Sequence, residues 1–125
     1  MAFQFTVSLD GINLAGELFD TPAARSLAAG LPLELTLNRW GEEYYGSLGG
    51  PLQGASSPTQ EVMSVGDIAH WEPGTAFCIF FGPTPMSGGN EPVAAGPVHL
   101  LGNVSGDWNQ ISAMGSTVQA SLRKS

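Results

Sequence analysis

The sequence predicts a single, mainly β domain over residues 1–125. Apolar and polar side chains alternate in several short segments, which is the pattern of half-buried strands. Residues 76–81 form a continuous apolar run, and the chain contains 17 glycines and 9 prolines, which favour many tight turns. A chain of 125 residues is long enough for one domain to bury a hydrophobic core of its own.

The first two predicted strands form a hairpin. Residues 3–9 alternate between apolar and polar side chains, and residues 12–18 resume the same alternation. Asp10-Gly11 lies between them and is a common two-residue hairpin turn. The two strands are therefore expected to pair antiparallel.

A short helix and a third strand are predicted next. Thr21 followed by Pro22 is typical of a helix start, and Gly30 is typical of a helix end. The alanine-rich residues between them have good helix propensity. Residues 33–37 then alternate with leucine at every second position, which predicts the third strand.

The middle of the chain has weaker signals. Residues 39–45 break the alternation, and residues 49–59 are rich in Gly, Ser and Pro, which is typical of a loop. Short strands are predicted at residues 61–65 and 68–71. Glu72-Pro73-Gly74 then has the composition of a turn.

The apolar run at residues 76–81 predicts the central strand of the core. Because apolar residues occupy every position of this run, both faces of the strand are expected to be buried. Gly82-Pro83-Thr84-Pro85 cannot continue a strand ladder. The rest of the chain predicts a loop at 86–95, a strand at 98–104, a short helix at 107–114 beginning at Asp107, and a last strand at 117–122.

Composition excludes several classes of function. Eleven acidic residues against four basic ones give a net charge of −7, which disfavours nucleic acids and anionic membranes. No apolar run approaches the length of a membrane span, and no secretory leader is visible at Met1. The single cysteine, Cys78, permits no internal disulfide, so a cytoplasmic location is expected. No nucleotide or cofactor fingerprint occurs.

The order of the segments resembles the cyclophilins. The opening FTVSLDGINLAGELFDTPAARSLAAGLP has the strand, Asp-Gly turn, strand and Pro-initiated helix of that family. AFCIFFG, PVHLLGNVSGDWNQISAM and TVQASL follow in the family's order. LPLELTLNRWGEEYY, VGDIAHWEPG and CIFFGPTP are more similar to small prokaryotic cyclophilin-like proteins of unassigned activity. The resemblance implies a closed eight-stranded β-barrel with one or two short capping helices.

The resemblance does not extend to the usual prolyl isomerase residues. The segment that carries the family's arginine reads Glu-Glu-Tyr-Tyr at residues 42–45. The family's pocket glutamine corresponds to Ala76, its second phenylalanine to Cys78 and its histidine to Val98, and the pocket tryptophan has no counterpart. His99 is one place later, where a strand would turn it to the opposite face. The isomerase site is therefore expected to be absent, with a weak peptidyl-prolyl isomerase as the alternative.

Isolated reactive residues have structural as well as functional interpretations. Cys78 could be a nucleophile, but its apolar neighbours favour a buried structural thiol. His70, with Asp67 and Glu72 near it, contains metal-capable groups, although a surface strand is the commoner interpretation. The sequence neighbours of His99 indicate no role for it. No metal or cofactor is expected.

Adjacent carboxylates and a set of aromatic residues complete the candidates. Glu42 and Glu43 would face opposite sides of an extended segment, which argues against a paired-carboxylate site. A groove for a small anionic molecule or a peptide is predicted beside the irregular loops, with Arg39 as its positive centre. Alternatively, Arg39 pairs with Glu42 or Glu43 and the aromatic residues fill the barrel ends. The predicted ligand-binding residues are Arg39, Tyr44, Tyr45, Phe80 and Met86, with Trp40 and Trp71 nearby.

A non-isomerase binding domain is thus the first functional hypothesis. A third hypothesis is a subunit whose sheet edge or proline-rich loops bind a protein partner. The oligomeric state is left open by the sequence.

Overall fold

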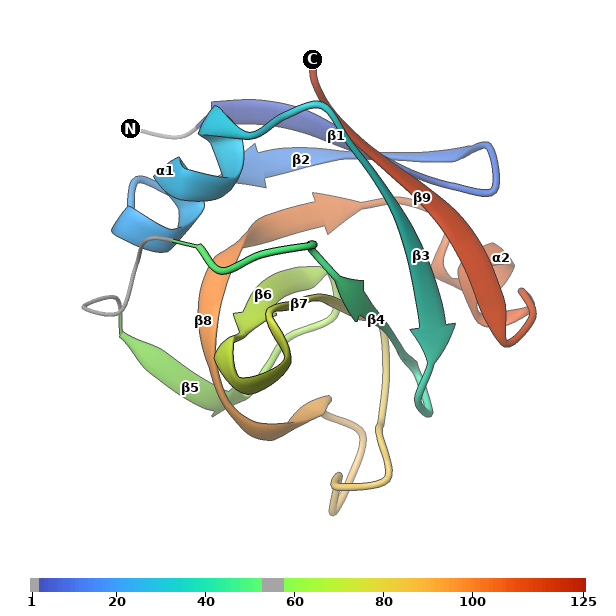
Figure 1. Cartoon of the computed structure of the whole chain (residues 1–125). Helices are drawn as coiled ribbons and strands as arrows, with labels where there is room; N and C mark the ends of the chain where they lie inside the picture. The colour runs from blue at the N-terminus through green and yellow to red at the C-terminus, as the bar shows by residue number, and fades with distance from the viewer. Residues whose placement is uncertain (1–2, 53–57) are drawn as a thin grey trace.

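The computed structural model describes residues 3–52 and 58–125. Nine strands and two α-helices make up most of these residues (Figure 1). The strands are β1 (Phe3–Leu9), β2 (Ile12–Leu18), β3 (Leu33–Arg39), β4 (Glu43–Ser47), β5 (Thr59–Val62), β6 (Asp67–Trp71), β7 (Ala76–Phe80), β8 (Val93–Ser105) and β9 (Thr117–Lys124). The helices are α1 (Pro22–Ala29) and α2 (Trp108–Ser112), and a 3-10 turn, Glu72–Gly74, joins β6 to β7.

Eight of the strands close into an antiparallel barrel. Their order is β2-β1-β9-β3-β4-β7-β6-β8, and β8 pairs back with β2. β5 pairs with the first half of β8, outside this ring. The expected closed eight-stranded barrel with two short helices is confirmed.

The β1–β2 hairpin has the predicted register. Phe3 pairs with Leu18 at one end and Leu9 with Ile12 at the other. Asp10 and Gly11 have φ angles of 47° and 88°, which both central residues of a type I′ turn require. The hairpin and its turn are therefore as expected.

Close approach of two backbones closes the barrel. A Cβ atom on Gly102 of β8 would lie 2.0 Å from the carbonyl oxygen of Glu17, and one on Gly16 of β2 would lie 2.0 Å from that of Asn103. No side chain fits in either space, so β2 and β8 can pair only because both positions are glycine.

Alternation along the strands separates two hydrophobic clusters. Phe77 and Ile79 of β7 face the inside of the barrel, where they join residues of β1, β2 and β9. Ala76, Cys78 and Phe80 face outward and join a second cluster that includes Ala94 and Val98 of β8. All five residues of β7 are buried, as predicted for the central strand.

β8 covers the outer face of β6 and β7 because it is long and bends. The register between β6 and β8 shifts between Ile68 and Ala69, which leaves one extra residue on β8. A bulge of this kind bends a strand and increases its twist. In Figure 1, β8 accordingly curves around one side of the barrel, so its first half reaches residues that point away from the barrel core.

The two helices begin where the sequence indicates. The Thr21 hydroxyl accepts a hydrogen bond from the Ala24 amide at 3.2 Å, and the Asp107 carboxylate accepts one from the Gln110 amide at 3.2 Å. Leu27 of α1 and Ile111 of α2 are buried in the barrel core. The helices thus close the barrel interior from two sides.

Three expectations in the irregular segments were wrong. Residues 39–45 do not simply break the sheet, because β4 begins at Glu43 and pairs with both β3 and β7. β5 lies at Thr59–Val62 rather than 61–65, and β8 begins at Val93 rather than after the loop predicted to end at 95. The predicted loop at 49–59 includes 53–57, which lie outside the described residues. Backbone pairing with long neighbouring strands outweighs weak local pattern in these segments.

Candidate functional site

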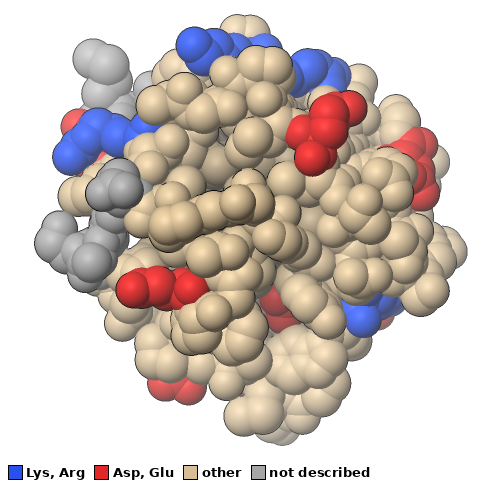
Figure 2. Space-filling model, viewed as in Figure 1, with Lys and Arg blue, Asp and Glu red and all other residues tan. Residues whose placement is uncertain are grey.

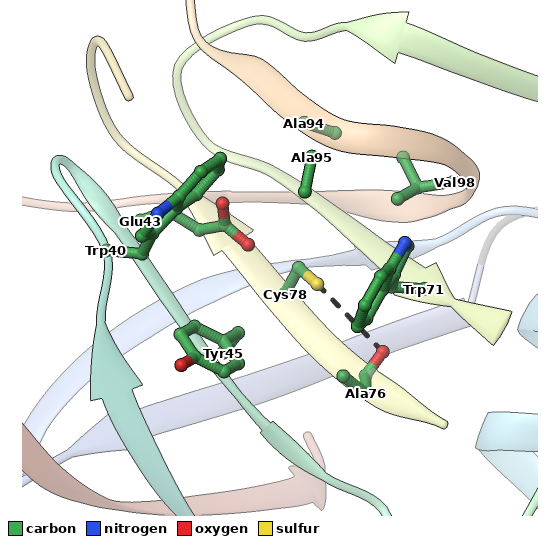
Figure 3. A pocket seen from close by; sticks show the side chains of 9 residues that line it. All are labelled: Trp40, Glu43, Tyr45, Trp71, Ala76, Cys78, Ala94, Ala95 and Val98. Carbon is green, nitrogen blue, oxygen red and sulfur yellow. Dashed lines mark hydrogen bonds between the residues drawn. The ribbon is translucent and has the colours of Figure 1, made fainter. Parts of the chain in front are cut away.

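An apolar pocket lies on the outer face of β4, β7 and β6. Its volume is about 270 Å³. Figure 3 shows its walls, which come from the segment after β3, from the three strands and from the first half of β8. The residues lining it are Trp40, Glu43, Tyr45, Trp71, Ala76, Cys78, Ala94, Ala95 and Val98.

Strand pairing brings these side chains to one face. Tyr45 of β4 pairs with Cys78 of β7, and Trp71 of β6 pairs with Ala76 of β7. Side chains at paired positions of neighbouring strands point to the same side of the sheet. Glu43, two residues before Tyr45, therefore faces the pocket as well.

Small residues on β8 leave the pocket open. Ala94, Ala95 and Val98 form its wall opposite Tyr45 (Figure 3). Gly96 lies beside the Trp71 indole, since a Cβ atom there would be 3.7 Å from Nε1. Large side chains at these positions would fill the space that the aromatic residues surround.

Glu43 is the unusual polar group of the pocket. Its side chain is only 5% exposed, and its Oε1 atom has no hydrogen-bond partner among the described residues. Burial raises the pKa of the Glu43 carboxyl to about 7, although the nearby Cys78 thiol acts in the opposite direction. A buried carboxyl group with an unused oxygen is costly to stability, which is typical of functional sites.

Cys78 forms part of the pocket floor. The thiol is 3% exposed, and its Sγ atom contacts the carbonyl oxygen of Ala76 at 4.0 Å (Figure 3). Burial, and then the Glu43 carboxyl group, raise the pKa of Cys78 well above its usual value. This environment favours the protonated thiol, in agreement with a structural cysteine rather than a nucleophile.

Arg39 lies on the other side of the sheet. Its guanidinium group is 5.7 Å from the centre of the Tyr44 ring and 5.3 Å from that of Phe81. Nη1 donates to the carbonyl oxygens of Ser112 at 2.8 Å and Met114 at 3.0 Å. These contacts fasten the end of α2 to the barrel.

The same guanidinium group forms an ion pair with Glu42. Nε also donates to the carbonyl oxygen of Gly41 at 2.8 Å, and the Ser112 hydroxyl donates to the Glu42 carboxylate at 2.8 Å. Pairing of Arg39 with Glu42 was one of the alternatives that the sequence left open. Glu42 and Glu43 face different sides, as expected for adjacent residues of an extended segment.

The structure brings together only some of the predicted ligand-binding residues. Tyr45 lines the pocket, as do Trp40 and Trp71. Tyr44 is fully buried in the barrel core, where its hydroxyl donates to the carbonyl oxygen of Gly115 at 2.6 Å. Phe80 is fully buried in the outer cluster, and Met86 is 55% exposed in the loop after β7. Ligand contact by Arg39 or by these three residues stays a prediction.

Sequence reasoning did not assign Glu43 to a ligand site. It treated the segment around Glu43 as an interruption of the sheet, so the alternation of Glu43, Tyr44 and Tyr45 was not used. An expected strand beginning at Glu43 would have placed its carboxyl group on the same face as Tyr45.

His70 does not lie on a surface strand, so that interpretation was wrong. The side chain is 2% exposed, and its ring stacks on His99 with the ring centres 5.9 Å apart. His99 Nε2 lies 3.2 Å from a carboxylate oxygen of Glu72. Burial, and then the charge of His99, lower the pKa of His70. Among the described residues, no group of three or more His, Cys, Asp or Glu side chains is arranged to hold a metal ion.

Charged side chains are scattered over one face of the molecule. Figure 2 shows separate acidic and basic residues on the face viewed in Figure 1, without a continuous basic area. Within the described residues, neither helix has the length and apolar character needed to cross a membrane.

Comparison with known proteins identifies the family. The cyclophilin-like family matches residues 3–123. The chain is also similar to a hypothetical protein from Archaeoglobus fulgidus with a known solution structure. The two share 26% sequence identity and a TM-score of 0.74, and the match covers 99% of this chain and 95% of the archaeal chain. No curated protein matches the chain. The chain therefore belongs to the cyclophilin-like family.

Proposed function

We infer that this domain binds a small molecule or a short peptide in the pocket between β4, β7, β6 and β8, and that it lacks the usual prolyl isomerase residues. The observation that carries this proposal is a buried carboxyl group, Glu43, with an unused oxygen in an otherwise apolar pocket. Ligand sites commonly combine apolar walls with a few polar groups that orient the ligand.

The aromatic residues of the pocket support the same proposal. Trp40 and Trp71 are only partly buried, and Tyr45 is 38% exposed. Aromatic rings that are not fully packed in the core offer apolar area to a ligand at small entropic cost. The pocket volume of about 270 Å³ suits a small molecule or a single side chain.

The positions of the isomerase counterparts favour binding without isomerisation. Ala76, Cys78 and Val98 line the pocket at positions where the family resemblance expects glutamine, phenylalanine and histidine. His99 stacks on His70 and is not among the lining residues. The guanidinium group of Arg39 is engaged on the other side of the sheet. Among the described residues, none of those that line the pocket offers an arginine or amide side chain to a prolyl bond.

A screen of metabolites and short peptides tests the proposal. Binding is measured by thermal shift and by perturbation of the indole N–H resonances of Trp40 and Trp71. Ala95→Phe should block the pocket, because Ala95 lies on its exposed rim. Ala15→Phe is the matched control, since Ala15 is exposed on β2 and is not among the pocket residues. Ligands that bind equally well to wild type and to Ala95→Phe would contradict the proposed site.

Weak prolyl isomerase activity is the second candidate. The observation in its favour is the location of the pocket. Its lining includes Ala76, Cys78 and Val98, the positions that correspond to isomerase residues in the family resemblance. Uncatalysed prolyl isomerisation takes tens to hundreds of seconds, so acceleration is easily measured. Acceleration that is lost in Ala95→Phe and kept in Ala15→Phe would favour this second candidate over a pure binding domain.

A further inference from the structure

The pocket is surrounded by aromatic rings on several sides. Trp40 follows β3, Tyr45 belongs to β4 and Trp71 ends β6, so the three rings come from three different segments. Figure 3 shows Trp40 and Tyr45 on one side of Cys78 and Trp71 on the other. The faces of such rings attract cations, and the attraction contributes about 0.5 to 2 kcal/mol, with the larger values at desolvated sites.

Glu43 is the only acidic residue among the described residues that line the pocket. Glu43 is only 5% exposed. Figure 3 shows its carboxyl group directed into the space between Trp40 and Cys78. Oε1 accepts no hydrogen bond from any described residue. A positively charged group in the pocket would supply the missing counter-charge, and such a charge pair is stronger where it is removed from water than in solvent.

No basic side chain lines the pocket. The chain has four basic residues, and none of them is among the lining residues. Arg39 pairs with Glu42, Arg25 pairs with Asp20, and the other two lie at the end of β9. The net charge of −7 also attracts cations and repels anions. Among the described lining residues, no positively charged side chain is present to pair with the anionic ligand that was expected from Arg39.

We propose that the pocket binds a compact organic cation, a methylated or quaternary ammonium group on a small molecule, with Trp40, Tyr45 and Trp71 around it and Glu43 as its counter-charge. This inference rests on the proposed ligand-binding function and names the chemical class of the ligand. The volume of about 270 Å³ accommodates a compact head group rather than a large molecule.

Binding of the cation should be linked to ionisation of Glu43. The carboxyl group faces Cys78 of β7 and Tyr45 of β4 as the other titratable lining groups, and the lining residues of β6 and β8 carry none. Burial raises the pKa of Glu43 to about 7 in the empty pocket, and a bound cation favours the carboxylate. Cation binding should therefore release a proton at about pH 6 to 7, and the affinity should rise with pH and level off above about pH 8.

Choline and its neutral carbon isostere provide the test. The isostere has a tert-butyl group in place of the trimethylammonium group, so shape is conserved and charge is removed. Dissociation constants are measured from the indole N–H resonances of Trp40 and Trp71 at several values between about pH 5.5 and about pH 8.5. At about pH 8 choline should bind roughly tenfold more tightly than the isostere.

Glu43→Gln separates the charge from the shape of the pocket. This variant should lose about tenfold in choline affinity at about pH 8 and should lose the pH dependence, because its amide does not ionise. Glu34→Gln is the matched control, since Glu34 is exposed on β3 and is not a lining residue. It removes one negative charge from the domain but leaves the pocket unchanged, so it should bind choline as wild type does.

Three results would overturn the proposal. They are an isostere that binds as tightly as choline, a choline affinity that falls as pH rises, and a Glu43→Gln variant that binds choline as wild type does. Binding of the isostere alone would leave the pocket as a ligand site and reject the cation. Failure of every screened compound, choline included, to perturb the two indole resonances would reject the proposed function as well.

Discussion

Tyr45 and Cys78 stand opposite each other in the β4–β7 ladder, and both side chains face the same pocket. This pairing places a partly exposed aromatic ring directly beside a buried thiol. The next residue before Tyr45, Tyr44, pairs with Ile79 and faces the barrel core instead. One strand therefore separates the pocket from the core, and variants on its two faces should have different effects.

Replacing Glu43 by Gln should change how stability depends on pH. The pKa of Glu43 is about 7 in the folded protein, against 4.5 for the free group. Between these values the folded state keeps a proton that the unfolded state has lost, so the free energy of unfolding of wild type falls as pH rises. Above about pH 7 this contribution is constant, and its full size is about 3 kcal/mol.

Glu43→Gln lacks this titration. The stability of the variant relative to wild type should therefore increase by about 2 to 3 kcal/mol between about pH 4 and about pH 8. Urea unfolding of both proteins at these pH values measures the difference, with Glu34→Gln as the exposed control. A constant difference over this range would show that Glu43 is not buried as described.

Replacing Arg39 by Lys should destabilise the barrel end. Lysine keeps the positive charge but lacks the guanidinium N–H groups that donate to the carbonyl oxygens of Gly41, Ser112 and Met114. The expected loss is about 1.5 to 3 kcal/mol in the free energy of unfolding, because these hydrogen bonds involve a charged donor. Ligand affinity should remain that of wild type, since Arg39 is not among the pocket residues.

Arg25→Lys is the matched control for this substitution. Arg25 forms an exposed ion pair with Asp20, with the two side chains 59% and 49% exposed. Exposed pairs contribute less than about 1 kcal/mol, so the control should be almost neutral. Equal losses in the two variants would contradict a structural role that is particular to Arg39, and a large loss of ligand affinity in Arg39→Lys would return Arg39 to the ligand site.

Replacing Gly102 by Ala should weaken the β2–β8 pairing that closes the barrel. A Cβ atom at this position would lie 2.0 Å from the backbone of Glu17, so β2 and β8 would have to separate. The expected loss in the free energy of unfolding is about 2 to 3 kcal/mol or more, as for other substitutions that overpack a rigid contact. Thermal unfolding and protection of the β2 amides from hydrogen exchange measure this effect.

Gly88→Ala is the control for the Gly102 variant. A Cβ atom on Gly88 would meet nothing within 4 Å. Alanine at such a site should be neutral or should stabilise the protein by up to about 1 kcal/mol, because it restricts the unfolded chain. If both glycine variants are equally stable, β2 and β8 do not approach each other at Gly102 as closely as the structure indicates.

Cys78 should react slowly with alkylating reagents in the folded protein. The thiol is 3% exposed, and burial raises its pKa well above the usual value, so little thiolate is present. The rate of reaction with iodoacetamide, followed by mass spectrometry, should increase strongly in denaturing urea. A bound ligand should slow the reaction of the folded protein further, whereas rapid labelling without denaturant would indicate an open, reactive thiol.

Local pattern was sufficient for the regular parts of the fold. The Asp10-Gly11 turn, the helix between Thr21 and Gly30 and the buried strand at Ala76–Phe80 were all predicted correctly. Each depends on interactions within a few residues, such as positive φ angles, a capping hydroxyl or an unbroken apolar run. The order of these segments also indicated the family and, with it, the closed barrel.

Strands with weak local pattern could not be predicted in the same way. Glu43–Ser47 contains a buried acid, two tyrosines and a glycine, and it forms β4 because β3 and β7 offer backbone partners on its two edges. Ladder hydrogen bonds with both neighbours outweigh the poor β propensity of single residues. That strand in turn decides which side chains meet in the pocket.

The sequence by itself determined a β-rich, acidic domain of the cyclophilin-like family with an apolar central strand. Only the tertiary structure decided that Arg39 is engaged at the barrel end, while Glu43 lies buried among Trp40, Tyr45 and Trp71. The physical reason is that a one-residue step along a strand turns a side chain to the other face. Which side chains are buried on the outer face of the sheet depends on how β8 bends over β6 and β7. That packing brings together residues that are far apart in the chain.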